Sequence, residues 1–478
     1  MTTLFTEPLK IVNVGLRSFS DSIAAAGGQV LELDWQPPAN GQIETGRALA
    51  RMIVDSRVEE ANKFALQTML AVDPVLKDIL PAKELIPELS KRKMLLHAGP
   101  PVMWEKMCGP MRGAIVGAVL LERWAATAEE AERLASCGDI EFAPCHHFGA
   151  VGPMAGVISP SMPLWVVADA NGEGCAYSSL NEGLGKVLRF GAHDSGVLDR
   201  LRWMKDVLAP ILREVLHTSG SIVLKPLMAQ SLHMGDELHN RNSAATSLLF
   251  KRLMVDLLKC SHSDAHKVEV ANFIALNDHF FLNISMAACK VMLDAAHGIA
   301  HCSLVTAMAR NGMEFGIRVS GTGSTWFTAP APTVRGLFFA GFGEQDASPD
   351  LGDSAITETA GFGAFSLAAA PAIAQFVGGS AEDAVSTTLR MRRIAFGVNP
   401  AFTIPFLAFS GTPFGIDVRR VVDRSIVPIM DTGIAHREAG VGQIGAGLSN
   451  APIECFIAAL DELGRKLGNS PPPSGKQS

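Results

Sequence analysis

The fold is first indicated by the short apolar stretch Lys10–Gly15 (KIVNVG), which has the composition of a buried strand in a parallel sheet. A helical pattern follows over Ser18–Ala26 and ends at two glycines, and a second apolar run over Val30–Trp35 ends before two prolines. Another predicted strand, Met94–Ala98, is again followed by a helical pattern. Strands that alternate with helices are typical of a doubly wound α/β fold, so we expect a Rossmann-like domain over residues 1–139.

The sequence pattern changes three times beyond this domain. Residues 140–197 are rich in glycine, proline and short apolar runs and predict a small α+β segment, whereas residues 198–300 predict a helical domain. Short strands and Ala-rich helices in residues 301–467 predict a mixed α+β domain, and the polar, Pro-rich residues 468–478 predict a disordered tail. We therefore expect a multidomain protein that combines α/β and α+β parts.

The composition excludes several classes of protein. The chain has 478 residues, of which 48% are hydrophobic and 19% charged, so it is neither disordered nor fibrous. The net charge is −7 and no long Lys/Arg run occurs, which argues against a nucleic-acid partner. Three uncharged stretches are each interrupted by proline or glycine, which argues against a membrane span.

The cysteines and the first 16 residues bear on the cellular compartment of the protein. None of the eight cysteines forms a C-x-x-C pair, which argues against a zinc ribbon or an iron–sulfur cluster. The first 16 residues lack the basic and apolar regions of a signal peptide. Free thiols without an export signal predict a cytoplasmic protein.

Polar clusters in apolar, glycine-rich surroundings are the most informative feature for function. A buried polar group without a partner costs about 1–3 kcal/mol, so such groups are paired or functional. His146 and His147 follow the predicted strand Ile140–Ala143, and α/β sites usually form at such strand ends. A histidine there can polarise a carbonyl group or move a proton near neutral pH. The alternative is a packing cluster without chemistry.

Two more clusters lie within predicted helices. The stretch Met234–Asn242 (MGDELHNRN) interrupts an apolar helical pattern, and helical spacing places Glu237 and Arg241 on one face, as part of a site or of a solvated stripe. Asp278 and His279 are adjacent on a second predicted helix. Because adjacent side chains on a helix diverge, each of these two needs a partner from elsewhere.

The remaining clusters combine cations with glycines. Glu182 stands four residues before Lys186, a spacing that also fits an ordinary helical ion pair. The guanidinium groups of Arg310 and Arg318 can hold a carboxylate or a phosphate. Further polar residues occur in Asp353–Glu358 and in Asp431–His436. The glycine-rich stretch that follows His436 contains G-x-G-x-x-G, but no helical pattern opens after it, so it is a weak dinucleotide signal.

From these clusters we select candidates for two roles. The candidate catalytic residues are His146, His147, Asp278 and His279, and the candidate substrate-binding residues are Glu182, Asp236, Glu237, His239, Asn240, Arg241, Asn242, Arg310, Asn311, Arg318 and His436. We assign no metal site and no cofactor. We expect these histidines and arginines to meet in one concave chamber, shielded from water and sized for a small anion.

Several of these segments carry a family resemblance. The strings HAGPP from His97, PCHHFGAVGPMAGVISPSMP from Pro144, MGDELHNRNSAATS from Met234 and DTGIAHREAGVGQIGAG from Asp431 occur in this order within Leu4–Leu460. On them the chain resembles the YlbE/YahG-like family. The resemblance implies one subunit of an oxamate carbamoyltransferase of allantoin catabolism, which interconverts oxalurate and phosphate with oxamate and carbamoyl phosphate. It also implies an oligomer with an FdrA-like subunit, itself similar to succinyl-CoA synthetase, and a small third subunit.

The resemblance brings no catalytic residue with it. The chain lacks the S-T-R-T-R loop and the H-P-x-Q segment of the familiar carbamoyltransferases, so any carbamoyl transfer here uses another set of residues. A small anionic substrate such as carbamoyl phosphate or oxamate requires Arg or Lys for its charge and a donor for the carbonyl oxygen. Three alternatives remain open: a non-catalytic binding or scaffold subunit, a metal-dependent amidohydrolase, and an N-terminal domain that handles CoA or a nucleotide.

Overall fold

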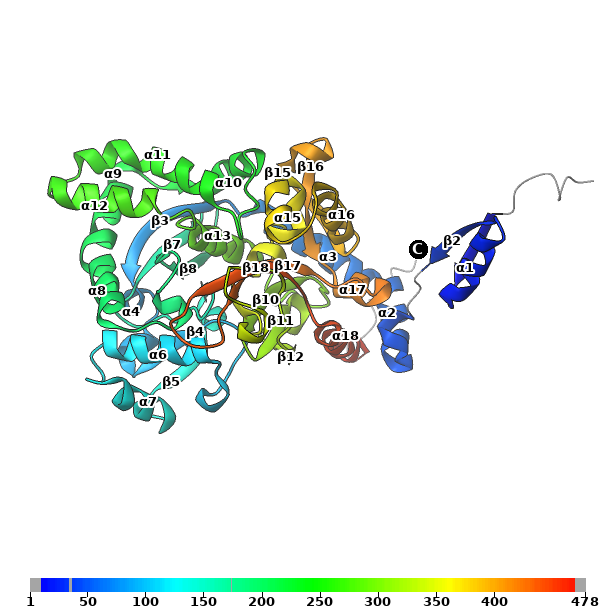
Figure 1. The fold of residues 1–478 in the computed structure, drawn as a ribbon, viewed down its shortest axis with the longest axis horizontal. Coiled ribbons are helices and arrows are strands. Elements are labelled where there is room, and N and C mark those ends of the chain that lie inside the picture. The colour runs from blue at the N-terminus through cyan, green and yellow to red at the C-terminus, as the bar shows by residue number, and fades with distance from the viewer. Residues whose placement is uncertain (1–9, 34–36, 173, 469–478) are drawn as a thin grey trace, which may run out of the picture.

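A computed structural model describes residues 10–33, 37–172 and 174–468 of the chain (Figure 1). Its helices and strands are mixed along the chain and form several small sheets, as expected for a protein with α/β and α+β parts. Asp34 and Trp35 of the predicted second strand and the predicted tail from residue 469 onward lie outside the described residues. Within the described ranges, no helix is long and apolar enough to cross a bilayer.

The strands of the first 139 residues belong to three different sheets. β1 (Lys10–Val14) and β2 (Gln29–Leu33) pair in parallel with each other, and β4 (Met94–His97) pairs in parallel with β5 (Glu141–Pro144). β3 (Pro74–Pro81) instead joins a five-stranded sheet, where both of its neighbours are antiparallel. A doubly wound domain requires parallel neighbours joined by crossover helices in one sheet, so a Rossmann-like N-terminal domain is not confirmed.

The five-stranded sheet has the order β6-β8-β7-β3-β9. Its remaining strands are β6 (Ala150–Val151), β7 (Pro163–Asp169), β8 (Cys175–Ser179) and β9 (Ile222–Val223). Helix α13 (Leu282–Asp294) packs on β7 and β8, near the middle of the molecule in Figure 1. Its residues 282–293 are all buried, as the nearly continuous apolar sequence of this helix predicts.

Residues 198–300 are mostly helical, with two breaks where the sequence predicts helix. The helices are α8 (Ser195–Trp203), α9 (Ala209–Ser219), α10 (Leu224–His233), α11 (Ser243–Lys259), α12 (Asp264–Ala275) and α13. The prediction that Met234–Asn242 is helical is wrong, because Gly235 and Leu238 have φ angles of +92° and +67°, which a right-handed helix cannot contain. The prediction that Asp278 and His279 are helical is also wrong, since both lie in the turn between α12 and α13.

Two further sheets lie in the C-terminal half of the chain, and the first of them contacts α13. One has the order β12-β11-β10-β14, and the other has the order β13-β18-β17. Their strands are β10 (Val305–Asn311), β11 (Glu314–Val319), β12 (Phe327–Pro330), β13 (Arg335–Phe338), β14 (Leu351–Gly352), β17 (Ile429–Ala435) and β18 (Gln443–Asn450), and β15 (Ala395–Ile404) and β16 (Ser410–Ile416) form a separate hairpin. The stretch with G-x-G-x-x-G falls mostly on β18, not on a phosphate loop.

The other α-helices of the described ranges pack on one of the sheets or on one another. They are α1 (Arg17–Ala25), α2 (Ile43–Val54), α3 (Ser56–Ala71), α4 (Ala82–Leu85), α5 (Glu88–Lys91), α6 (Gly109–Leu121), α7 (Ala128–Ser136), α14 (Ile356–Thr359), α15 (Pro371–Phe376), α16 (Ala381–Arg392), α17 (Val418–Arg424) and α18 (Ile453–Gly468). The short helix α14 contacts both α13 and β10. It therefore brings the polar segment Asp353–Glu358 to the centre of the molecule.

Candidate functional site

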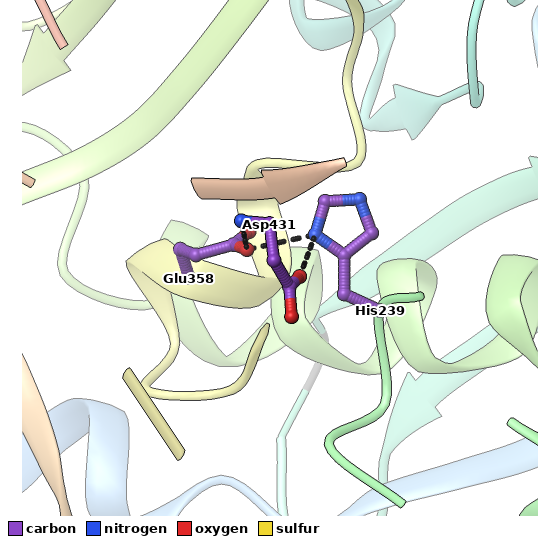
Figure 2. Close-up of side chains that lie close together, drawn as sticks. All are labelled: His239, Glu358 and Asp431. Carbon is purple, nitrogen blue, oxygen red and sulfur yellow. Dashed lines mark hydrogen bonds and ion pairs between the residues drawn. The ribbon is translucent and has the colours of Figure 1, made fainter. Parts of the chain in front are cut away.

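Three buried side chains from distant parts of the chain meet beside α14 (Figure 2). They are His239 from the loop after α10, Glu358 from α14 and Asp431 from β17. The Nδ1 atom of His239 lies 2.8 Å from Oε1 of Glu358 and 3.4 Å from Oδ1 of Asp431. The side chains are 4%, 0% and 0% exposed, so their mutual contacts replace contacts with water.

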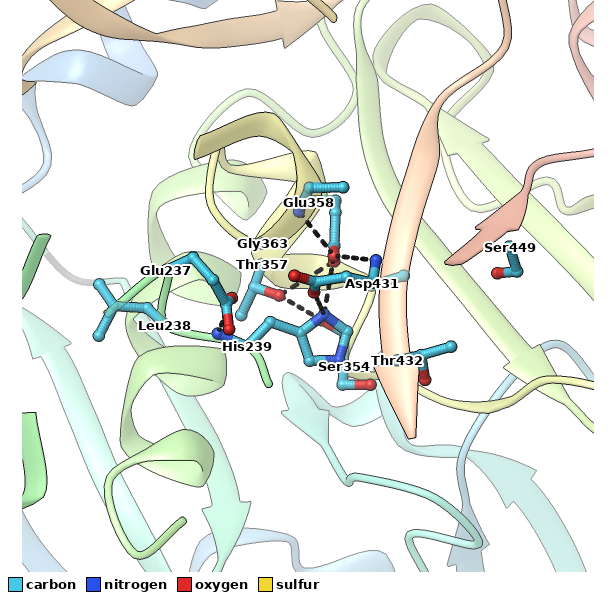
Figure 3. Close-up of polar contacts among 12 residues, drawn as sticks. Glu237, Leu238, His239, Ser354, Thr357, Glu358, Gly363, Asp431, Thr432 and Ser449 are labelled. Atoms are coloured by element: carbon cyan, nitrogen blue, oxygen red, sulfur yellow. Dashed lines mark hydrogen bonds and ion pairs between the residues drawn. The ribbon is translucent and has the colours of Figure 1, made fainter. Parts of the chain in front are cut away.

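A third carboxylate, Glu237, lies against the same group (Figure 3). Its oxygens accept hydrogen bonds from the backbone N–H groups of His239 and Arg241. Burial, followed by the charges of the neighbouring carboxylates, raises the pKa of Glu237 and of Asp431 well above the ordinary values. We call Glu237, His239, Glu358 and Asp431 the acidic cluster.

A second group, buried except for half-buried His297, contains an arginine and a lysine instead of carboxylates. His146, which follows β5, has its Nε2 atom 3.4 Å from Oδ1 of Asp353, and Arg318 of β11 donates a hydrogen bond to the His146 carbonyl. Arg318 also lies 2.8 Å from Nδ1 of His297, and Lys290 of α13 lies 2.6 Å from Asp294. We call His146, Lys290, His297 and Arg318 the cationic cluster.

Burial sets the protonation of the cationic cluster. It lowers the pKa of Lys290 and of His297, and it lowers the pKa of His146 although the charge of Asp353 acts in the other direction. Exposed His147 lies next to the cluster and accepts a hydrogen bond from Trp326 Nε1 at 3.0 Å. Burial of part of its ring and the charge of Arg318 lower its pKa to about 4. These histidines are neutral near pH 7, which suits proton transfer or polarisation of a carbonyl group.

A narrow cavity is lined by Pro153, Gly156, Glu182, Arg189 and Asn283, among others. Its volume of about 10 Å³ gives room for about one water molecule. Glu182 accepts hydrogen bonds from the backbone N–H groups of Leu188 and Arg189, and the Arg189 guanidinium donates to the Gly183 carbonyl at 2.6 Å. Burial lowers the pKa of Arg189 to about 10, yet the group remains a cation at neutral pH.

Comparison with known proteins decides the family. The family model "Oxamate carbamoyltransferase subunit AllG" matches residues 140–354, which contain the whole cationic cluster. Oxamate carbamoyltransferase subunit AllG of Escherichia coli K12 is 48% identical over 413 residues, which are 86% of this chain and 99% of AllG. The uncharacterized protein YahG of the same strain is 46% identical over 462 residues, 96% of this chain and 98% of YahG. The chain belongs to the AllG/YahG family.

One solved structure has the same fold as this chain. It is the crystal structure of a conserved protein of unknown function from Enterococcus faecalis V583, with a TM-score of 0.84 and 44% sequence identity. The match covers 86% of this chain and 98% of that chain. The family model and the two Escherichia coli relatives confirm the predicted family resemblance, and the solved structure shows the same overall fold.

Within this AllG/YahG fold, some of the predicted site residues do meet. His146 contacts Arg318, and Glu237 contacts His239, as described above. Asn242 donates a hydrogen bond to the His239 carbonyl at 2.8 Å, which fixes the loop that carries Glu237 and His239. Half-buried His279 lies close to Arg189, and its burial and the Arg189 charge lower its pKa to about 4.

Other predicted residues are placed in structural contacts. Arg310 is fully buried, and its guanidinium lies 2.9 Å from both Asp350 Oδ1 and the Gly352 carbonyl. The Asn311 side-chain oxygen accepts hydrogen bonds from the N–H groups of the following turn, and Asp236 accepts one from the first turn of α11. Arg241 pairs with Asp236 at 3.4 Å, and Asn240 lies in the same loop.

Two predicted residues lie away from both clusters. The side chain of Asp278 is exposed, and half-buried His436 accepts a hydrogen bond from the Glu438 N–H and stacks edge-on against Phe342. Glu182 does not pair with Lys186, because residues 180–187 form a loop and Lys186 pairs with Asp194 at 2.7 Å. The expected single chamber is therefore replaced by two clusters and a narrow cavity.

Four residues of the two clusters, Glu358, Asp431, Lys290 and His297, and Asp353 beside them are not among the residues selected from the sequence. Glu358, Asp353 and Asp431 lie in polar segments to which the sequence assigns no role, because only the folded chain shows what surrounds them. Lys290 is the single charge in the apolar part of α13, and such a residue is a usable signal. His297 follows that helix and gives no such signal.

Proposed function

We propose that this protein is a subunit of an oxamate carbamoyltransferase-like complex that moves a carbamoyl group between a ureido acid such as oxalurate and phosphate. The observation that supports the proposal is the buried cationic cluster, present in a chain that is 48% identical to an oxamate carbamoyltransferase subunit. Both substrates are anions, and buried Arg and Lys groups bind anions strongly because water does not screen them. We propose that the protein acts in the cytoplasm.

The proposed reaction is a single acyl transfer. An oxygen of phosphate bonds to the carbamoyl carbon of oxalurate, the bond from that carbon to the amide nitrogen breaks, and oxamate leaves after its nitrogen takes a proton. In this proposal Arg318 binds the phosphate together with Lys290, which exchanges its partner Asp294 for the anion, and Arg189 binds the carboxylate of the ureido acid. His146, neutral near pH 7, moves the proton or polarises the carbonyl oxygen.

A reconstituted complex tests the proposal. The chain is produced together with an FdrA-like subunit and a small third subunit, and carbamoyl phosphate formed from oxalurate and phosphate is measured by a coupled carbamate kinase reaction. We expect turnover that depends on all three subunits. A stable complex without turnover from oxalurate in either direction would contradict carbamoyl transfer from this substrate.

Ligand binding to the isolated chain separates a catalytic subunit from a scaffold. A ligand that binds only the folded state raises the melting temperature as its concentration exceeds the dissociation constant. We expect oxamate, phosphate or carbamoyl phosphate to stabilise the chain. No shift for any of these ligands, with turnover retained in the complex, would place the active site on a partner subunit.

A further inference from the structure

We propose that the acidic cluster binds one divalent metal ion, with Mn²⁺ as the preferred ion, through His239, Glu358 and Asp431. The inference concerns this chain alone and does not depend on the reaction proposed above. It departs from the sequence analysis, which assigned no metal site.

The spacing of the three side chains fits a metal ion. One potential ligand atom from each residue can be chosen so that all of them lie within 4.8 Å of one another. An octahedral ion with bonds of about 2.1 Å places adjacent ligand atoms about 3.0 Å apart and opposite ones about 4.2 Å apart. The observed distances of 2.8 and 3.4 Å from His239 Nδ1 to the two carboxylates are close to the adjacent spacing.

The charge balance of the cluster favours a cation. Three carboxylates, those of Glu237, Glu358 and Asp431, surround one imidazole, and their side chains are fully buried. Within the described ranges, no Lys or Arg side chain pairs with any of the three. Buried charges of like sign repel one another and have lost their hydration, so the cluster gains stability from any cation that enters it.

Asp431 is the side chain that most needs a partner. Neither of its carboxylate oxygens receives a hydrogen bond from the part of the chain that the structure describes, although both are fully buried. Glu358 differs, because it accepts hydrogen bonds from the Asp431 N–H at 3.2 Å and from Thr357 Oγ1 at 3.1 Å. A buried carboxylate with both oxygens free for a further bond is the expected state of a metal ligand.

A glycine lies where the backbone approaches the carboxylates of Glu358 and Asp431. Gly363 begins the 3-10 helix η8 (Gly363–Ala369) with a φ of +55°, and its N–H donates to the Glu237 carbonyl. A Cβ atom at this position would lie 2.1 Å from Glu358 Oε1 and 3.2 Å from Asp431 Oδ1. Only glycine allows the backbone to pass so close to both carboxylates.

The ligand set selects the class of ion. Carboxylate oxygens suit Mg²⁺ and Mn²⁺, whereas an imidazole favours Mn²⁺ and later transition metals over Mg²⁺. Structural zinc sites use mainly Cys and His, and no cysteine belongs to this group of ligands. One imidazole with two carboxylates therefore fits Mn²⁺ best, with Zn²⁺ and Mg²⁺ as the competing ions.

Metal titration of the full-length chain tests this proposal. The chain is treated with a chelator, dialysed and titrated with Mn²⁺, while calorimetry measures binding and electron paramagnetic resonance measures free Mn²⁺. We expect one ion per chain and a higher melting temperature. The Asp431→Asn and Glu358→Gln variants should each weaken binding by at least about tenfold, as the loss of a metal contact does.

A matched control uses a carboxylate that also lies beside a histidine. Glu214 is 3.4 Å from His262 Nε2, but both side chains are partly exposed, and Glu214→Gln should leave Mn²⁺ binding unchanged. In the native chain, pulsed paramagnetic resonance should also detect a histidine nitrogen bound to Mn²⁺. This measurement decides the matter even if both variants fail to fold.

Three results would overturn the proposal. They are the absence of stoichiometric binding of Mn²⁺, Zn²⁺ or Mg²⁺ by the native chain, unchanged binding in folded Asp431→Asn and Glu358→Gln variants, and bound Mn²⁺ without a coordinated nitrogen. In each case the negative charge of the cluster would be balanced by protons instead.

Discussion

The acidic and cationic clusters show two ways in which this fold treats a buried carboxylate. Asp353 lies beside the cationic cluster, and its two oxygens accept hydrogen bonds from the backbone N–H groups of Gly99 at 2.7 Å and Gly152 at 3.0 Å. Asp431 in the acidic cluster accepts none from the described residues. The two residues have the same chemistry and the same burial, so the difference lies in what the surrounding backbone offers.

This difference in hydrogen-bond donors indicates what each cluster can bind. Asp353 has hydrogen-bond donors for both oxygens without a ligand and can hold His146 in place. Lys290 pairs with Asp294, so Arg318 is the member of the cationic cluster whose charge is available to an anion. The buried carboxylate of Asp431 needs a proton or a metal ion to balance its charge. One central segment, 353–358, supplies a carboxylate to each of these neighbourhoods.

The largest expected effect on the free energy of unfolding is at Arg310, a buried arginine that lies outside the cationic cluster. Arg310→Ala leaves Asp350 buried without its guanidinium partner, and breaking a buried pair costs about 3–5 kcal/mol. Urea unfolding should show this loss. Arg202→Ala, which removes a half-exposed partner of Asp199, should change the free energy of unfolding by about 0–1 kcal/mol. An equally small effect at Arg310 would mean that this arginine is available to a ligand.

A smaller loss is expected where the backbone approaches the acidic cluster. Gly363→Ala introduces a methyl group against two carboxylates at a positive φ, which should destabilise the chain by about 2–4 kcal/mol. Gly220 also has a positive φ of +75°, but no atom lies within 4 Å of its added Cβ. Gly220→Ala should therefore cost only about 1 kcal/mol. Equal losses in the two variants would show that the carboxylates do not need this space.

The two buried aspartates should respond with opposite signs. Asp353→Asn keeps one acceptor oxygen for two backbone N–H groups, so it should lower the free energy of unfolding by about 1–3 kcal/mol. Asp431→Asn removes a charge that has no donor, so it should stabilise the chelator-treated chain. Thermal unfolding of both variants without metal measures the contrast. Destabilisation by both would contradict the difference between the clusters.

The smallest expected effect is a difference in pH dependence. The raised pKa of Asp431 means that the folded state binds more protons than the unfolded state above about pH 4, so this group's stabilisation is lost as pH rises through its folded pKa. The lowered pKa of His147, about 4, means that the unfolded state binds more protons between about pH 4 and 6.5, so this group's stabilisation is lost as pH falls.

Melting temperatures of the metal-free chain from pH 4 to 7 measure this difference. Compared with the native chain, Asp431→Asn should retain more stability as pH rises, and His147→Gln should retain more as pH falls. Curves parallel to that of the native chain would show that neither group changes its proton affinity on folding.

Local patterns predicted single elements better than their assembly. The elements β1, α1 and β4 lie where the sequence places them, because apolar runs and amphipathic periods act locally. The sequence analysis predicts no strand at β3, and an alternation of strands and helices does not specify which strands become neighbours in a sheet. The loop at 234–242 was missed because it depends on the left-handed conformation of Leu238, a residue that rarely adopts it.

The candidate site shows the same limit. His146, Arg318, Glu237 and His239 stand out in the sequence as polar residues in apolar surroundings, and all four lie in the two clusters. Their proposed roles stay predictions. Asp353 and Asp431 look alike in the sequence, and Arg310 looks like Arg318. Contacts with residues from distant parts of the chain decide which of these buried charges has partners within the protein and which does not.

The central claim is that the cationic cluster performs carbamoyl transfer, and Arg318 tests it most directly. In the assembled complex, kcat/KM for carbamoyl phosphate formation from oxalurate and phosphate is compared for the native chain, Arg318→Ala and the exposed control Arg202→Ala. Removing a group that stabilises transition-state charge costs about 10²–10³-fold, and we expect that loss for Arg318→Ala and no change for Arg202→Ala. A folded, assembled Arg318→Ala complex with native kcat/KM would contradict the account.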